Sequence, residues 1–127
     1  MSVLVDSSIW IDYLRNVRNS KSVDKLLDDN ALVINDLVLA ELIPALMLKR
    51  QQSLIKHLRV IRRLPLRIDW DDLIKMQAKC LRKGINKVGI PDLIIAQNSI
   101  QHKIALYTRD KHFQLLSQHI PLTLFQV

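Results

Sequence analysis

Residues 90–110 constrain the fold of this chain more than any other stretch, and they read I-P-D-L-I-I-A-Q-N-S-I-Q-H-K-I-A-L-Y-T-R-D. The first half has the length and apolar spacing of a buried helix, and Pro91 with Asp92 is typical of a helix's first turn. Residues 104–107 form a short apolar run that is typical of a buried strand. A buried helix followed directly by a buried strand indicates an α/β domain.

Two acids of this stretch occupy informative positions. Asp92 lies at the start of the predicted helix, and Asp110 follows the predicted strand. In open α/β sheets, ligands bind in the crevice outside the carboxyl ends of the strands. Asp110 is therefore placed for chemistry, and we expect it to have partners elsewhere in the chain.

Strand and helix patterns alternate along the whole sequence. We expect strands at residues 2–5, 31–34, 66–68, 104–107 and 122–125, with helices in the intervening segments. This alternation predicts an α/β fold with a mostly parallel central sheet and helices on both faces. With 127 residues and 49% hydrophobic content, the chain is expected to form one domain over residues 1–127.

Residues 37–48 leave almost no polar face, which predicts a helix that is buried nearly all round. Glu41 lies in its middle and is the only glutamate among the twelve acidic residues. A buried carboxylate is unfavourable by several kcal/mol unless it is paired or protonated. A salt bridge to a neighbouring Lys or Arg is one solution, and a shared cation is another.

Residues 69–84 have the start and stop signals of a further helix. Asp69, Asp71 and Asp72 stand at its beginning, and basic residues followed by Gly84 stand at its end. We therefore interpret these three acids as capping and dipole residues in preference to metal ligands.

Four other acids follow the strand order. Asp6 ends the first strand, Glu41 lies on the helix after the second, and Asp92 and Asp110 flank the strand at 104–107. Parallel packing brings such positions to one edge of a sheet. Two unit charges about 4 Å apart repel by about 4 kcal/mol at an effective dielectric near 20, so a cluster of this kind requires protons or cations.

The donor types favour Mg²⁺ or Mn²⁺ for that cluster, because both ions prefer oxygen ligands. Zinc prefers His or Cys at close spacing, an arrangement that Cys80 and the four histidines do not show. An acidic metal crevice on a basic protein suggests hydrolysis of nucleic-acid phosphodiesters, in which the metal activates water and offsets charge on the phosphate.

The chain has a formal net charge of +7, which indicates either a polyanionic partner or a surface rich in solubilising Lys and Arg. Residues 49–63 combine an apolar stripe with a dense basic face. We take that face as the candidate contact to a nucleic-acid phosphate backbone, although such faces are usually only solvated. Its members are Lys56, Arg59, Arg62 and Arg63.

The location expected for this chain is the cytoplasm. No apolar run approaches the roughly 18–20 residues needed to cross a membrane. The N-terminus has neither the basic region nor the cleavage site of a secretory signal.

Four motifs in order resemble the PIN-domain proteins of the VapC toxin type. They are V-D-S-S-I-W-I at residues 5–11, L-V-L-A-E-L at 37–42, P-D-L-I-I-A at 91–96 and T-R-D-K-H-F at 108–113. The resemblance covers essentially the whole length, and it depends on the order of the motifs more than on any one of them.

The resemblance implies a three-layer α/β/α domain with a Mg²⁺- or Mn²⁺-dependent endoribonuclease site made by Asp6, Glu41, Asp92 and Asp110. Ser7 and Thr108 match positions that often support the site through hydrogen bonds, although each also fits a simple helix-start role. The sequence departs from the family at His112, where many members have a further Asp. This departure argues against a fifth ligand or a fully occupied second metal position.

The resemblance also implies a cognate antitoxin protein, a homodimer and an RNA target, most commonly transfer RNA in this family. The residues argue against one alternative and leave two open. A phospho-receiver domain requires adjacent acids after the first strand, where this chain has Ser7 and Ser8. A metal-independent ribonuclease would use histidines as acid and base. A binding module without catalysis would hold the acids for structural reasons.

Overall fold

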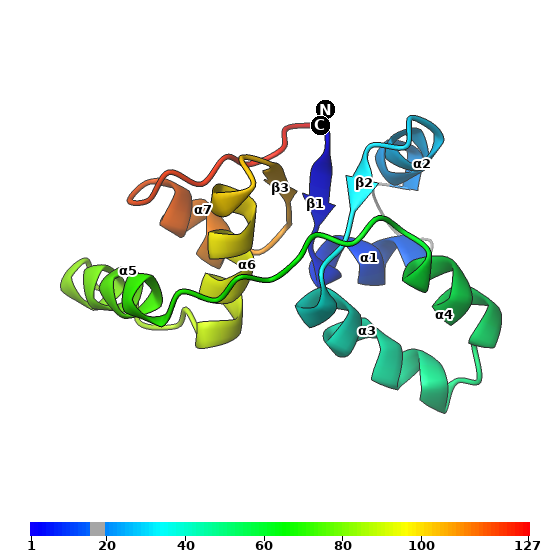
Figure 1. The fold of residues 1–127 in the computed structure, drawn as a ribbon, viewed down its shortest axis with the longest axis horizontal. Helices are drawn as coiled ribbons and strands as arrows, with labels where there is room; N and C mark the ends of the chain where they lie inside the picture. The colour runs from blue at the N-terminus through cyan, green and yellow to red at the C-terminus, as the bar shows by residue number, and fades with distance from the viewer. Residues whose placement is uncertain (16–19) are drawn as a thin grey trace.

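The computed structural model describes residues 1–15 and 20–127. Figure 1 shows a central sheet with α5, α6 and α7 to its left and α1 to α4 to its right, and the predicted three-layer α/β/α fold is confirmed. Within the described residues the helices are α1 (Ser7–Leu14), α2 (Ser20–Asp28), α3 (Asp36–Leu48), α4 (Gln52–Arg59), α5 (Trp70–Arg82), α6 (Ile90–Gln101) and α7 (Lys111–Ser117). The strands are β1 (Val3–Val5), β2 (Leu32–Val33) and β3 (Ala105–Tyr107).

The sheet is parallel and has the order β2-β1-β3. The central strand β1 is fully buried, as expected for a parallel strand covered on both faces. Its last residue, Val5, is in register with Tyr107, the last residue of β3. The chain therefore leaves both strands at the same edge, immediately before Asp6 and Thr108.

Helix α6 and strand β3 confirm the prediction made from residues 90–110. Pro91 lies in the first turn of α6, and Leu93, Ile95 and Ala96 are buried. The helix packs against β3 and α5. Its C-terminal end leads through two turn residues into the strand, so the position of Asp92 is fixed relative to the sheet.

Helix α3 is buried on one side only, so the prediction that it is buried nearly all round is wrong. Its inward residues pack toward α1 and α4, whereas Met47 is 58% exposed and Leu48 is 88% exposed. Glu41 is also exposed as a residue. The reason is that α1 and α4 cover one face of α3, and its opposite face remains open at the surface of the described chain. The buried side chains of α3 are Val38, Leu39, Leu42, Ile43 and Leu46.

Two predicted strands do not form in the described residues. Residues 66–68 are irregular, and pairing with Ile34 is confined to a bridge at Arg63. Pro65 has no N–H to donate, which ends the ladder at that point. The segment 122–125 likewise makes one bridge, between Leu124 and Leu106.

Helix α5 begins and ends as predicted. The Asp69 side chain accepts a hydrogen bond of 3.1 Å from the Asp72 backbone N–H, which caps the helix. Gly84 follows the C-terminus with φ of +74°, a conformation that favours glycine. None of the helices in residues 1–15 and 20–127 has the length and apolarity needed to cross a membrane.

Candidate functional site

The register of β1 and β3 places Asp6 beside Thr108. The Asp6 backbone N–H donates to the Tyr107 carbonyl at 2.9 Å, which continues the ladder one step beyond the strands. The Thr108 hydroxyl donates to Asp6 Oδ2 at 2.9 Å. Asp6 is only 4% exposed, so this hydrogen bond fixes a carboxylate that is largely withdrawn from water.

A second hydroxyl, that of Ser8, also holds Asp6. Ser8 Oγ donates to Asp6 Oδ2 at 2.9 Å and accepts a hydrogen bond of 3.2 Å from the Arg109 backbone N–H. Ser8 lies in the first turn of α1, so the start of this helix is tied to the loop after β3. Sequence reasoning selected Ser7 and missed Ser8, although both hydroxyls were visible directly after the acid.

The loop after β3 is fixed from two sides. The Asp110 backbone N–H donates to Thr108 Oγ1 at 3.0 Å, and Asp110 Oδ1 accepts from the His112 backbone N–H at 2.9 Å to cap α7. Arg109 Nε lies 2.8 Å from Asp12 Oδ2, and Asp12 is buried in α1. This ion pair holds the loop against α1, and sequence reasoning gave no role to either partner.

Asp92 lies at the start of α6 and faces the acids of both strand ends. Its pKa is raised above the ordinary value, first by partial burial, then by the charges of Asp110 and Asp6. A backbone hydrogen bond from Gly89 and the nearby His112 act in the opposite direction. The net direction shows that the surrounding residues do not fully compensate the negative charge of Asp92.

Glu41 completes the group from the side of α3. Partial burial of its carboxylate raises its pKa, and the charges of Asp6 and Asp92 raise it further, whereas a hydrogen bond from Ser7 lowers it. Ser7 therefore supports Glu41, while Thr108 supports Asp6. We call Asp6, Glu41, Asp92 and Asp110 the acid cluster; they come from four different segments of the chain.

Part of the acid cluster has the dimensions of a cation site. One ligand atom each of Asp92, Asp110 and His112 lie within 4.8 Å of one another. A cation bound at about 2.0–2.2 Å from each ligand separates two ligand atoms by roughly 3 Å when they are adjacent and up to roughly 4.4 Å when they are opposite. The two separations of His112 Nδ1, 3.4 Å to Asp110 Oδ1 and 4.0 Å to Asp92 Oδ2, fall within this range.

A set of buried amides links the start of α3 to α6, and α6 to the start of α5. Asn35 Nδ2 donates to Asn98 Oδ1 at 3.0 Å, and Asn98 Nδ2 donates to the Pro65 carbonyl at 2.9 Å. Gln97 Nε2 donates to the Asp69 carbonyl at 3.0 Å and to Asp72 Oδ2 at 2.7 Å. We call Asn35, Gln97 and Asn98, with these hydrogen bonds, the amide network. It fixes the helices that position Glu41 and Asp92.

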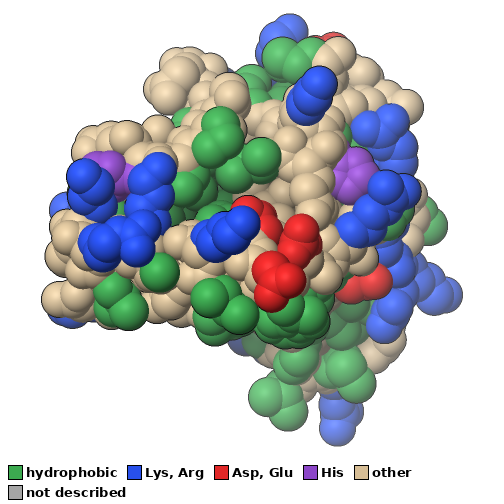
Figure 2. Space-filling view, turned by 60° about the vertical axis from the view of Figure 1, so that its left-hand side comes forward, with side chains coloured by type: hydrophobic (Ala, Val, Ile, Leu, Met, Phe, Trp, Pro, Cys, Tyr) green, Lys and Arg blue, Asp and Glu red, His purple; other side chains and the backbone are tan. Residues whose placement is uncertain are grey.

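The basic residues expected to contact RNA are all exposed, but two of them have protein partners. Arg63 Nη1 lies 3.1 Å from Asp36 Oδ1, and Arg62 Nη2 donates to Ser2 Oγ at 2.8 Å. Lys56 and Arg59 project from α4. Figure 2 shows the wider distribution on one face, where acidic side chains gather near the centre and Lys and Arg side chains lie on both sides.

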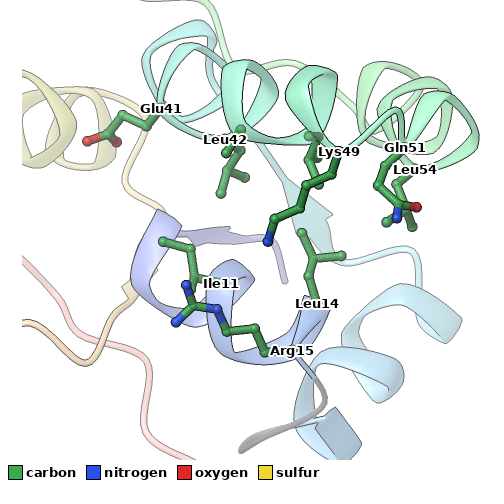
Figure 3. Close-up of a pocket in the computed structure, with 10 residues that line it drawn as sticks. Ile11, Leu14, Arg15, Glu41, Leu42, Lys49, Gln51 and Leu54 are labelled. Atoms are coloured by element: carbon green, nitrogen blue, oxygen red, sulfur yellow. The ribbon is translucent and has the colours of Figure 1, made fainter.

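A groove of about 390 Å³ runs between α1, α3 and the start of α4, with Glu41 at one end (Figure 3). Its apolar lining includes Ile11, Leu14 and Leu42, and two cations, Arg15 and Lys49, extend into it. Sequence reasoning missed both cations because Arg15 follows the end of α1 and Lys49 follows the end of α3, and only the fold brings these two helix ends to one groove. The groove thus joins an apolar floor to the acid cluster.

Sequence comparison identifies one family. The sequence model of the PIN domain matches residues 3–117, which is most of the chain. No curated protein sequence matches the chain.

Comparison with solved structures gives matches over nearly the whole length. VapBC2 from Rickettsia felis, bound to a DNA fragment from its promoter, matches with a TM-score of 0.77 and 19% identity, covering 98% of both chains. VapBC-1 from nontypeable Haemophilus influenzae matches with a TM-score of 0.74 and 23% identity, covering 99% of this chain and 98% of the other. FitAcB from Neisseria gonorrhoeae matches with a TM-score of 0.72 and 19% identity, covering 98% of this chain and 96% of the other. At these identities the likeness shows a shared fold.

Proposed function

This chain belongs to the PIN-domain family, and from that premise we propose that it is a divalent-metal-dependent endoribonuclease and the toxin of a type II toxin–antitoxin pair in the cytoplasm. The observation that supports this most is the convergence of four acids from four segments. The pKa values of two of them, Glu41 and Asp92, are raised by burial and by the other carboxylates. A bound cation would neutralise this repulsion.

We assign the ligands from the resemblance to the family. Asp6 and Asp92 would be the central ligands, and Asp110 would bind directly or through water. Their oxygens are the donors that Mg²⁺ and Mn²⁺ prefer. When bound, such an ion lowers the pKa of water and stabilises charge on the transferring phosphate and the leaving oxygen.

The chain's own residues orient the reacting groups. Ser8 and Thr108 hold Asp6 in one orientation, so this carboxylate needs no rearrangement when substrate binds. Glu41 has a raised pKa and receives a hydrogen bond from Ser7. A carboxylate whose pKa is closer to neutrality is a better proton acceptor, and we assign Glu41 to orient the attacking water or to serve as a further ligand. Attack by water at phosphorus, with cleavage of the bond to the 3′ oxygen and protonation of that leaving oxygen, leaves a 5′-phosphate and a 3′-hydroxyl.

The proposed substrate is RNA, and transfer RNA is the target suggested by the family. The net charge of +7 favours a polyanion, and Lys56, Arg59, Arg62 and Arg63 are the contacts proposed from sequence. Arg63 is the least available of the four because it pairs with Asp36. Arg15 and Lys49 are stronger additions, since they line the groove that ends at Glu41.

We propose an antitoxin protein and a second copy of this chain as partners. The structural matches include VapBC complexes, in which a toxin is bound to its antitoxin. The groove beside the acid cluster has an apolar floor suited to a peptide segment. Met47 and Leu48 add exposed apolar surface on α3, which favours a protein contact there. Light scattering of the purified chain would measure the oligomeric state.

The decisive experiment is cleavage of total RNA by purified protein with Mg²⁺ or Mn²⁺, with and without chelator, beside Asp92→Asn. We expect cleavage that requires the metal, leaves 5′-phosphates and is lost in the variant. Asp71→Asn, which changes an exposed acid on α5, is the matched control and should cleave normally. Cleavage that survives chelator and leaves cyclic phosphates would support the histidine ribonuclease instead, and an inactive protein that binds RNA would support a binding module.

A further inference from the structure

We propose that the ring of His112 is a metal ligand, so that Asp92, Asp110 and His112 form a mixed oxygen and nitrogen site that favours Mn²⁺ over Mg²⁺. This inference rests on the proposed metal dependence and goes beyond the four acids of that proposal. From sequence, His112 argued against a fifth ligand because many family members have Asp at this position. In this inference the imidazole of His112 takes the place of that carboxylate as a ligand.

The geometry of His112 is the first argument. Its Nδ1 lies 3.4 Å from Asp110 Oδ1 and 4.0 Å from Asp92 Oδ2. These separations exceed the roughly 2.7–2.9 Å of a charge-assisted hydrogen bond. They fall within the roughly 3–4.4 Å that separates two donors around one divalent ion, from adjacent to opposite positions. One ligand atom from each of the three groups lies within 4.8 Å of the others, which is close enough for them to share an ion.

The position of the ring is also restrained. The His112 backbone N–H donates to Asp110 Oδ1 at 2.9 Å, which caps α7 and fixes the first turn that bears the ring. Asp110 is itself held through its backbone N–H by Thr108. The side chains of Asp92, Asp110 and His112 are between 26% and 37% exposed, so an ion from solvent has access to them.

Donor chemistry gives the predicted selectivity. Imidazole nitrogen is a good ligand for first-row transition ions, whereas Mg²⁺ prefers oxygen ligands and retains water. A site with two carboxylates and one imidazole should therefore bind Mn²⁺ more tightly than Mg²⁺. Replacing the imidazole with a carboxylate should reduce that preference while keeping a ligand at the position.

The test uses the full chain with Mn²⁺ alone and has a spectroscopic readout. Pulsed electron paramagnetic resonance of one equivalent of bound Mn²⁺ should show coupling to a coordinated ¹⁴N nucleus. His112→Gln should lose this coupling, and the control His119→Gln should keep it. Calorimetric titration should show that His112→Asp lowers the ratio of Mn²⁺ to Mg²⁺ affinity by about tenfold relative to the unaltered chain.

The outcomes separate this inference from the proposed function. Bound Mn²⁺ without ¹⁴N coupling, or an affinity ratio unchanged in His112→Asp, would overturn the role of His112 even if RNA cleavage still requires metal and Asp92. Absence of Mn²⁺ binding to the unaltered chain would overturn both proposals. A ¹⁴N signal that persists in His112→Gln would assign the nitrogen to another residue and would also overturn the inference.

Discussion

The acid cluster and the amide network both join residues of α6 to other segments of the chain, yet their polar groups are satisfied in different ways. In the amide network, Asn35, Gln97 and Asn98 are at most 2% exposed, and their amides pair with one another or with backbone and Asp72. In the acid cluster, each carboxylate has further carboxylates as neighbours, and two pKa values rise. The amide network is electrically neutral apart from its partner Asp72, whereas the acid cluster has excess negative charge.

This difference separates structural from functional polar groups. Buried amides with partners stabilise a unique arrangement of helices, because leaving any of them unpaired is unfavourable. A set of like charges opposes the folded state unless a cation joins it. The amide network therefore finds its hydrogen-bond partners within the chain, whereas the acid cluster requires a bound cation. Four predictions test that distinction.

The largest expected effect is on catalysis. Asp92→Asn keeps the size of the side chain and removes its charge, so we expect RNA cleavage to fall by about a hundred- to a thousandfold, the range for loss of one electrostatic stabilising group. Thermal unfolding in the absence of metal should show an equally or more stable protein, because repulsion is relieved. Cleavage equal to that of Asp71→Asn would contradict the functional reading of the acid cluster.

The amide network should respond in the opposite way. Asn98→Ala leaves Asn35 Nδ2 without its partner in the interior, whereas the Pro65 carbonyl keeps His102 Nε2 at 3.1 Å. We therefore expect the free energy of unfolding to fall by about 1–3 kcal/mol, the range for one unsatisfied buried group. Denaturant titration measures this change, and Asn86→Ala in an exposed loop is the control. A loss below about 0.5 kcal/mol would show that the network adds little to stability.

Much of the fold was predictable because the signals were local. The helix–strand unit at 90–110, the cap at Asp69 and the stop at Gly84 follow from propensity, periodicity and backbone chemistry. The errors involved information that is not local. The open face of α3 depends on how few elements pack against it, and the loss of a strand at 66–68 depends on Pro65 at the point where pairing would continue.

The candidate site was predictable in its acids and not in its supporting residues. Order along the strands and helices was sufficient to select Asp6, Glu41, Asp92 and Asp110 as one group, and the resemblance added their expected roles at a metal site. Ser8, the Asp12–Arg109 pair and the Asn35–Asn98 pair depend on side-chain directions across distant segments. One signal was available for the amides, since three consecutive polar residues interrupt an otherwise apolar buried helix at 97–99.

A smaller effect should follow from removing one hydroxyl that holds the acid cluster. Thr108→Val keeps the shape and removes the bonds to Asp6 Oδ2 and the Asp110 backbone N–H, so both carboxylates lose a restraint. We expect the dissociation constant for Mn²⁺ to rise by about tenfold, as is typical for groups that orient metal ligands. Calorimetry checks this, with Thr123→Val at an exposed position as the control. If Thr108→Val and Thr123→Val bound Mn²⁺ with equal affinity, the Thr108 hydroxyl would have no role in orienting the metal ligands.

The smallest effect concerns stability against pH. The folded-state pKa values of Glu41 and Asp92 are raised, so the unfolded chain ionises first as pH increases. Their contribution to metal-free stability is therefore fully present below the unfolded pKa of about 4 and is lost as pH rises through the folded values. In chelator, the free energy of unfolding should fall less steeply with pH for Asp92→Asn than for the unaltered chain. Denaturant titration from pH 4 to pH 8 measures this difference. Saturating Mn²⁺ should reverse the trend, because it binds the ionised carboxylates. If the free energy of unfolding of both proteins changed with pH in the same way in chelator, repulsion within the acid cluster would not affect folding stability.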